Sequence, residues 1–273
     1  MKDDIGDRFK GYEACFDFSL PRRLPMVIRV DGRAFHGLPL EKPFDACFVG
    51  VMQDVAIALC KEIQGSVLAY IQSDEISVIA RDDMTNTTEP WMGKRLSKVV
   101  SLSAAIATSV FTASPIAWAA ERQFDSRAFV LPDLNEVTNY LIWRQQDATR
   151  NSISMCAHAA FSHASLHGVD SNGKLDRLRE AGKPWEDIPT HYKRGMVCKK
   201  VSMWCASLQA GDIHERHEWQ IDLDPPVFTQ DRSYIESAYG PPRNPLFKSA
   251  QTIFVDGTIY SKPTASNGTP TKK

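Results

Sequence analysis

Long apolar runs are missing from this chain of 273 residues. No stretch approaches the roughly 18 consecutive apolar residues that a membrane-spanning helix requires. The N-terminal sequence MKDDIGDRFKGYE is charged and lacks the apolar segment of a secretory signal. We therefore expect a cytoplasmic protein without a membrane partner.

Cysteine pairs with metal-binding spacing are also missing. The six cysteines form no C-x-x-C motif, so neither a zinc site nor a disulfide framework is expected. His163 and His167 are four residues apart and His158 is near, but the absence of an acid between them disfavours zinc. Reduced and mostly buried thiols are expected at Cys15, Cys47, Cys60, Cys156, Cys198 and Cys205.

The chain also lacks a surplus of positive charge, since its formal net charge is −1. With this balance, any contact with RNA must come from a local basic patch or from an assembled oligomer. Lys193-Arg194 and Lys199-Lys200 form the strongest C-terminal basic clusters. An RNA-facing patch and an ordinary solvated surface both explain these clusters.

An acid-terminated strand is the most informative feature that is present. In residues 26–36 (MVIRVDGRAFH), three branched apolar residues surround Arg29 and predict a buried strand. This strand leads directly into Asp31-Gly32. Glycine lets the backbone turn and approach a ligand closely. A carboxylate site is favoured here, and a plain Asp-Gly turn is the alternative.

A second acidic element follows in residues 67–79. Apolar residues on both sides of a short polar turn predict a β-hairpin with Asp74 and Glu75 at its tip. Residues 44–63 and 94–112 have the apolar spacing of helices, and residues 127–131 predict a further strand. Pro43 and Asp45 suit the beginning of the first of these helices.

The order strand, helix, strand, strand, helix, strand is that of the split βαβ or ferredoxin-like arrangement, an α+β fold. Its right-handed crossovers place the first strand at the centre of the sheet, beside the hairpin. Asp31 and Asp74 would then meet at one edge. Two such carboxylates can hold two divalent cations, which activate an attacking oxygen and stabilise a leaving phosphate oxygen.

Six motifs stand in sequence order along the chain. They are RVDGRAFH at residues 29–36, KPFD at 42–45, AYIQSDEIS at 69–77, RLSK at 95–98, FDSR at 124–127 and WRQQD at 143–147. Over about residues 5–200 the chain thereby resembles the tRNA(His) guanylyltransferase family. It is most similar to the bacterial and archaeal Thg1-like proteins, the branch associated with 3′–5′ repair of tRNA ends.

The resemblance implies an enzyme that extends tRNA at its 5′ end. The 3′-hydroxyl of an incoming nucleotide attacks a 5′ phosphate that is activated as a triphosphate or by adenylylation with ATP. Two Mg²⁺ ions per active site, ATP and GTP as substrates, and a homotetramer are implied as well. The expected architecture is a polymerase-like palm in residues 5–132 with a helical and β region, 133–260, packed on it. Residues 261–273 have a composition typical of a disordered tail.

The resemblance also assigns roles to individual residues. Asp31, Asp74 and Glu75 would be catalytic, and Asp31, Gly32 and Asp74 would hold the metal ions. Backbone amides of Arg33, Ala34, Phe35 and His36 would cradle a triphosphate, with Lys42, Asp45, Ser73, Arg95, Ser97 and Lys98 also binding the nucleotide. RNA contacts would come from Arg127, Arg144, Arg150, Asn151, Lys193 and Arg194.

One departure from the family pattern bears on the substrate. Eukaryotic members carry a His-Ile-Asn-Asn run tied to selection of the histidine tRNA, and this chain reads Thr149-Arg150-Asn151-Ser152 at those positions. We therefore expect template-directed repair of truncated tRNAs rather than strict selection of tRNA(His). The alternatives are a dedicated guanylyltransferase that adds a single G, a nucleotide cyclase with a similar palm, and a non-catalytic RNA-binding protein on a decayed palm.

Overall fold

The structure, a computed structural model, describes residues 4–85, 87–206, 213–240, 252–255 and 258–261. The chain divides into two compact units, the first comprising Met1–Lys200 with Trp219–Gly240, and the second Val201–Glu218 with Pro241–Lys273. The division expected at residue 132 does not coincide with a boundary between these units. Among the described helices, none is long and apolar enough to cross a membrane.

A sheet in the order β4-β1-β3-β2-β5-β6 organises the first unit. Neighbouring strands from β4 to β5 are antiparallel, and β1 lies between β3 and β4 as expected. The strand bounds are Met26–Gly32 for β1, Ser66–Gln72 for β2, Glu75–Ala80 for β3, Phe124–Val130 for β4, Met196–Ala206 for β5 and Ile213–Asp222 for β6. The central position of β1 brings its acidic end beside the β2–β3 turn.

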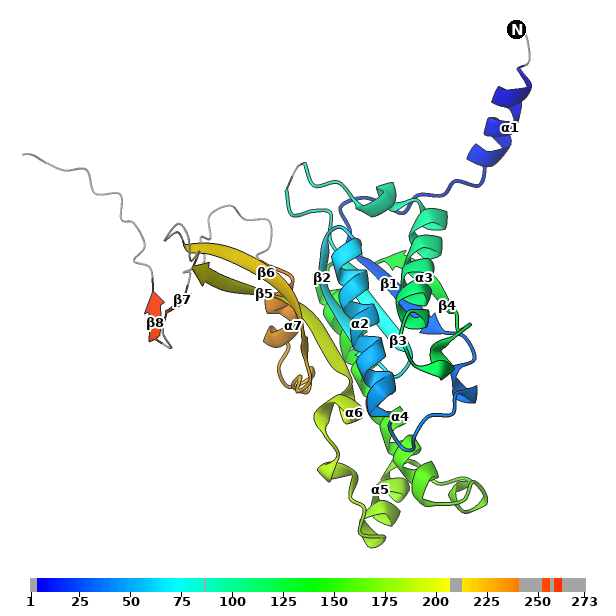
Figure 1. Cartoon of the computed structure of the whole chain (residues 1–273), viewed down its shortest axis with the longest axis vertical. Helices are drawn as coiled ribbons and strands as arrows, with labels where there is room; N and C mark the ends of the chain where they lie inside the picture. The colour runs from blue at the N-terminus through cyan, green and yellow to red at the C-terminus, as the bar shows by residue number, and fades with distance from the viewer. Residues whose placement is uncertain (1–3, 86, 207–212, 241–251, 256–257, 262–273) are drawn as a thin grey trace, which may run out of the picture. The chain divides into compact units, whose positions relative to one another are not determined.

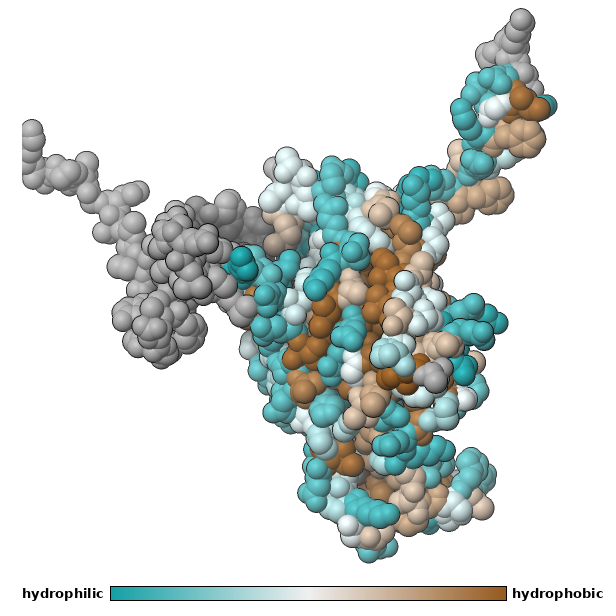
Figure 2. Space-filling view, viewed as in Figure 1, coloured by the Kyte–Doolittle hydropathy of each residue, from teal (hydrophilic) through white to brown (hydrophobic). Residues whose placement is uncertain are grey.

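Helices α2 (Ala46–Glu62) and α3 (Leu96–Thr112) cover one face of the sheet (Figure 1). Ile28 and Val30 of β1 pack in this layer. Helix α2 begins at Ala46 because the Asp45 carboxylate caps it, accepting from the Phe48 amide at 2.9 Å. On the outer side, apolar side chains gather over α2 and α3 (Figure 2).

Helix α4 (Leu134–Ala160) covers the opposite face, where Val27 of β1 packs with Val137 and Leu141. Its 27 residues make a rod of about 40 Å, whereas a seven-residue strand spans only about 23 Å. The helix therefore extends past the sheet at the end where β1 stops. This overhang places its C-terminal half beside the acidic turn.

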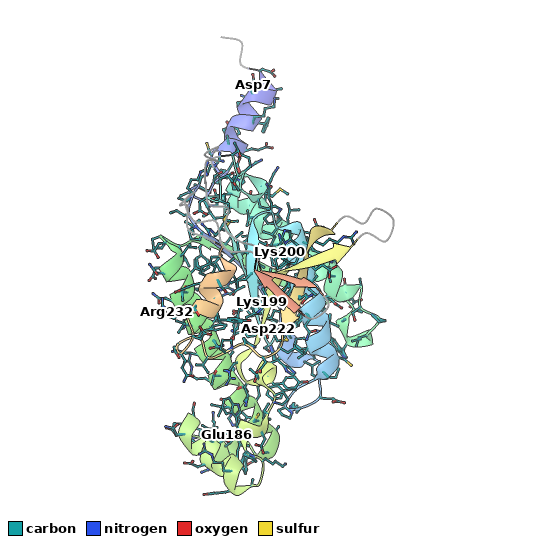
Figure 3. All side chains as sticks on the ribbon, turned by 90° about the vertical axis from the view of Figure 1, so that its left-hand side faces the viewer. Asp7, Glu186, Lys199, Lys200, Asp222 and Arg232 are labelled. Carbon is teal, nitrogen blue, oxygen red and sulfur yellow. The ribbon has the colours of Figure 1, made fainter. Side chains whose placement is uncertain are left out.

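The remaining elements of the first unit are short. Helix α1 (Ile5–Ala14) buries none of its residues, while α5 (Ser171–Glu180) and α6 (Thr190–Arg194) pack against α4, and α7 (Ser233–Ala238) follows β6. Lys199 donates to Asp222 at 2.9 Å (Figure 3). Both side chains contact the hydroxyl of Tyr234 in the first turn of α7, which fixes this helix to β5.

The second unit contains the outer parts of β5 and β6 and a two-stranded hairpin of β7 (Thr252–Val255) and β8 (Thr258–Ser261). Apolar and polar residues alternate in 197–205, and these residues lie within β5. Residues 262–273, most of the predicted disordered tail, lie outside the described residues.

Candidate active site

Asp31 and Asp74 meet at the end of β1, as the strand order predicted. Asp31 lies opposite Glu75 in the β1–β3 register. The Gly32 amide donates to the Asp74 carbonyl at 3.0 Å, which ties the end of β1 to the β2–β3 turn. Gly32 is required sterically, because a Cβ there would lie 2.5 Å from Cδ2 of Phe35. The backbone thus fixes both aspartates before any ligand binds.

Electrostatics at this turn favour a bound cation. Burial raises the pKa of Asp74, and the Asp31 carboxylate raises it further, while a hydrogen bond from Ser73 and the charge of His36 oppose the rise. Two neighbouring carboxylates that are partly buried repel each other when both are ionised. A divalent cation between them would remove that repulsion.

Glu75 is held by arginines. Arg144 binds it in bidentate geometry, with Nε to Oε1 and Nη2 to Oε2 both at 2.8 Å, and Nε of Arg29 lies 3.7 Å from Oε2. Burial raises the pKa of Glu75 even though Arg144 and Arg29 lower it. Because its two oxygens are engaged, Glu75 is placed to position the turn rather than to act as a free carboxylate.

Arg144 departs from its expected role as a contact to RNA. It is only 5% exposed, and Nη2 also donates to Asp147 at 3.1 Å. Arg144 therefore faces the cavity beside the acids rather than the outer surface, and its guanidinium is held by two carboxylates. The pairing of Glu75 with Arg144 spans 69 positions in sequence, so no local pattern could have indicated it.

A cavity of about 560 Å³ opens beside the acids. Asp31, Ser73, Asp74 and Glu75 line one part of it. Its apolar part, which sequence reasoning did not identify, is lined by Leu38, Leu40, Phe44, Phe48, Met155 and Tyr192. The volume lies in the range of small-molecule sites, and the combination of an apolar part with carboxylates is typical of them.

The turn after β1 supplies part of the predicted triphosphate cradle. Ala34 has left-handed backbone (φ 58°) and leads into the single turn of 3₁₀ helix Phe35–Gly37. His36 lines the cavity. Arg33 differs from the prediction, because its amide donates to the Gln123 carbonyl at 2.9 Å and is therefore already engaged.

The loop before α2 brings further predicted residues to the cavity. Lys42 and Asp45 line it. Asp45 accepts from the amides of Phe48 at 2.9 Å and Glu41 at 3.1 Å. Both hydrogen bonds are structural, so Asp45 fixes the loop, while Lys42 is the cation that this loop brings to the cavity.

The RLSK motif is not part of this cavity. Thr108 on α3 accepts from the Phe124 amide at 3.0 Å, and Phe124 is the strand partner of Gly32. Ser97 lies eleven residues earlier on the helix, or roughly 16 Å away from the acidic end. Arg95, Ser97 and Lys98 therefore lie toward the far end of α3, where Arg95 pairs with Asp17 at 2.8 Å.

The four residues that depart from the family pattern have separate roles on α4. Asn151 lines the cavity, whereas Arg150 is exposed and donates to Asp147 at 3.0 Å. Thr149 donates to the carbonyl of Gln145 within the helix at 2.9 Å. Ser152 is buried, accepting from the Trp185 indole at 3.0 Å and donating to the Lys193 carbonyl at 3.1 Å.

The other residues predicted to contact RNA lie in two places, with Lys193 and Arg194 at the end of α6 and Arg127 on β4. Nζ of Lys193 donates to the carbonyl of Glu186 at 2.6 Å, and the carbonyl of Arg194 accepts from Tyr70 at 2.5 Å. Arg127 lies on the edge strand β4, where it pairs loosely with Asp125 at 3.4 Å. These contacts engage the ammonium group of Lys193 and the backbone of Arg194, while Arg127 lies at the surface.

The donor set at the acidic turn fits Mg²⁺. In the described part of the chain, no group of three or more His, Cys, Asp or Glu side chains is arranged to hold a metal by itself. Mg²⁺ is commonly bound by one or two carboxylates together with substrate phosphates. Asp31 and Asp74 supply two carboxylates, and Glu75 is occupied by Arg144.

Comparison with known proteins gives a consistent result. The sequence model of the tRNAHis guanylyltransferase family matches residues 6–132. A probable tRNA(His) guanylyltransferase of Drosophila melanogaster is 31% identical over 245 residues, covering 82% of this chain and 83% of that protein. A protein of Acanthamoeba polyphaga mimivirus described only as uncharacterized is 26% identical over 229 residues, covering 73% of this chain and 78% of its own length.

Solved structures agree in fold as well as in sequence. A bacterial tRNA(His) guanylyltransferase (Thg1)-like protein in complex with ATP is 36% identical, with a TM-score of 0.78 over 88% of this chain and all of that one. The tRNA(His) guanylyltransferase of Saccharomyces cerevisiae is 25% identical, with a TM-score of 0.58 over 69% of this chain and 92% of that one. With its acid pair and cavity in the matched region, the chain belongs to the tRNA(His) guanylyltransferase family of nucleotidyltransferases.

Proposed function

We propose that this protein is a 3′–5′ nucleotidyltransferase that repairs 5′-truncated tRNAs by adding nucleotides in a template-directed manner. The observation that carries the proposal is the placement of Asp31 and Asp74 beside a cavity of about 560 Å³. The related bacterial proteins are described in complex with ATP and with GTP. A nucleoside triphosphate is therefore the proposed occupant of the cavity.

Asp31, Asp74 and the carbonyl of Gly32 would hold two Mg²⁺ ions, which when bound supply positive charge to the reacting phosphate oxygens. Lys42 would bind the triphosphate, since phosphoryl transfer needs cations at the nonbridging oxygens. The amides of Ala34, Phe35 and His36 would contribute hydrogen bonds. Arg144 would hold Glu75, and through it the turn that carries Asp74, in a fixed position.

Template direction follows from how the reaction must be oriented. In-line transfer needs the 3′-hydroxyl next to the activated 5′ phosphate, and an error of about 1 Å can cost roughly a hundredfold in rate. Pairing with the opposite strand of the acceptor stem would provide this orientation. Asn151 and Ser152, the two residues that follow Arg150, both line the cavity, and the Ser152 hydroxyl is already engaged by the Lys193 carbonyl.

A second function is favoured by the relatives, several of which are described as tRNA(His) guanylyltransferases. In that case the enzyme would add a single G to tRNA(His) alone. The homotetramer implied by the resemblance and the cytoplasmic location expected from the sequence remain predictions. Light scattering and cell fractionation would test them.

The deciding experiment uses a labelled tRNA that lacks its first nucleotide, incubated with ATP, Mg²⁺ and each NTP. The templating base opposite the gap is varied through all four identities. Under the proposal the added nucleotide follows the template and addition stops when the stem is complete. Addition of G whatever the template, and only to tRNA with the histidine anticodon, would establish the dedicated enzyme. A product formed from nucleotide alone would point to cyclase chemistry.

A further inference from the structure

Trp143 on α4 is an exposed aromatic side chain held in a fixed orientation. It is 48% exposed. The guanidinium of Arg144 lies 4.5 Å from its ring centre, and the ring of Tyr140 lies at 5.9 Å. Tyr140 is itself anchored, because its hydroxyl is 2.8 Å from that of the buried Ser77. A large apolar ring that is exposed yet fixed is suited to contact a partner.

Trp143 lies on α4 close to the residues that line the cavity. Trp143, Asp147, Asn151 and Met155 recur every four residues and so follow one side of the helix. The last three line the cavity. Trp143 precedes these residues by one helix turn, about 6 Å, and is not a lining residue itself, although the adjacent Arg144 is. Its neighbour Arg144 binds Glu75, the strand partner of Asp31.

Two basic side chains, those of Arg127 and Arg150, lie on the side of the sheet that α4 covers. The rings of Phe129 on β4 and Tyr140 on α4 contact each other at 5.7 Å. Toward the acidic end, the next helix turn carries Trp143, and Arg127 is the next β4 residue on the same face, two positions from Phe129. Arg127 and Arg150 are 51% and 54% exposed. An aromatic surface near two accessible cations therefore lies beside the acids but outside the cavity.

We propose that Trp143 is a stacking platform for the terminal base at the 5′ end of the RNA substrate, with Arg127 and Arg150 near its phosphates. This inference rests on the proposed function. The cavity accommodates the incoming nucleotide, so the RNA end must approach the acids from outside the cavity. Proteins commonly bind unpaired or terminal bases by stacking them on aromatic rings.

In this proposal, base stacking on Trp143 contributes more to RNA affinity than the charges of the two arginines do. Arg127 and Arg150 each pair with an aspartate, at 3.4 Å to Asp125 and 3.0 Å to Asp147. The local charge is therefore nearly balanced. Binding that depends on counterion release falls steeply with salt. The contribution of Trp143, measured as the ratio of wild-type to variant affinity, should instead change little with salt concentration.

The test uses an RNA hairpin whose 5′-terminal nucleotide is the fluorescent base 2-aminopurine, titrated with the full-length protein without ATP. Stacking on Trp143 should quench the fluorescence. Trp143→Ala should weaken binding about tenfold, equivalent to about 1.4 kcal/mol, and remove most of the quenching. Trp143→Phe should retain both. Met84→Ala, an exposed apolar residue at 44% after the opposite end of β3, is the matched control.

Two further measurements make the result decisive. Calorimetric ATP binding should be the same for Trp143→Ala and the wild type, because the side chain is not part of the cavity lining. The melting temperature should fall only slightly, since the half-exposed ring contacts Tyr140 and Arg144. Unchanged RNA affinity and quenching in Trp143→Ala would overturn the proposal, even if the wild type repairs tRNA as proposed. A change in oligomeric state in place of RNA affinity would also overturn it, by showing that Trp143 contacts a second copy of the chain. Quenching by a protein that adds no nucleotide to any tRNA would refute the proposed function and leave the platform supported.

Discussion

Arg144 should contribute more to stability than any exposed charge of this protein. Its bidentate pair with Glu75 is formed by two side chains that are only 7% and 10% exposed. Removing one partner of a buried pair leaves the other charge without compensation, which costs about 3–5 kcal/mol. In a unit of this size, 1 kcal/mol lowers the melting temperature by about 2–4 °C. Arg144→Met should therefore lower Tm by roughly 6–20 °C.

The matched control is Arg150→Met. Arg150 also pairs with Asp147, at 3.0 Å, but it is 54% exposed. Exposed pairs contribute about 0–1 kcal/mol, so this variant should melt within a few degrees of the wild type. Differential scanning calorimetry of both variants without nucleotide or metal gives the comparison directly. A loss below about 2 °C for Arg144→Met would refute the reasoning, because it would show that Glu75 is compensated by other groups.

A double variant separates stability from activity. Replacing a buried ion pair by apolar side chains of similar volume is often neutral or stabilising. Glu75→Leu combined with Arg144→Met should therefore recover much of the lost Tm. Nucleotide addition should not recover, because the turn carrying Asp74 would still lack its anchor. Recovery of both properties would mean that the pair has no role in positioning Asp74.

Three further predictions test separate parts of the site and fold. Asp31→Ala and Asp74→Ala should each reduce nucleotide addition by more than tenfold. The Tm measured without metal should hold or rise, because each substitution removes carboxylate repulsion. Retention of more than about a tenth of wild-type activity would contradict the acid-pair assignment. Lys42→Ala should weaken nucleotide binding measured by calorimetry, whereas Lys61→Ala at the end of α2 should not. Burial raises the pKa of Asp222, but hydrogen bonds from Tyr234 and Lys199 outweigh it and hold that pKa below its usual value. Asp222 thus stabilises the fold above the ordinary carboxyl pKa, and this stability is lost as pH falls through the lowered one. Urea unfolding at pH 7 and pH 3 should show a smaller pH effect in Asp222→Asn, and an equal effect in both proteins would contradict this account.

The local sequence pattern was enough to predict the strands and helices that position the site. Alternation and helical spacing located the strands and helices around Asp31 and Asp74, and the crossover rules placed β1 in the centre of the sheet. Asp45 was expected near a helix N-terminus, and it caps α2. These features depend on neighbouring residues and on chirality, which a sequence displays directly.

Partners distant in sequence could not be predicted. Arg144 was expected at the RNA surface, but a carboxylate 69 positions away binds it in the interior. Arg95, in the motif at the beginning of α3, was expected to bind the nucleotide, yet it pairs with Asp17. In each case a charge in a motif is neutralised by tertiary packing, which the motif itself does not encode.

Helix α4 has a mechanical consequence. It is one uninterrupted rod that is fixed at Glu75 through Arg144, at Pro226 and Phe228 through Gln145, and at Lys193 through Ser152. Because three sets of hydrogen bonds hold the helix, it cannot tilt at one of them without straining the others. The anchors at Arg144 and Ser152 are about two helical turns apart. We therefore expect a substitution near residue 152 to alter the geometry around Asp74 as well.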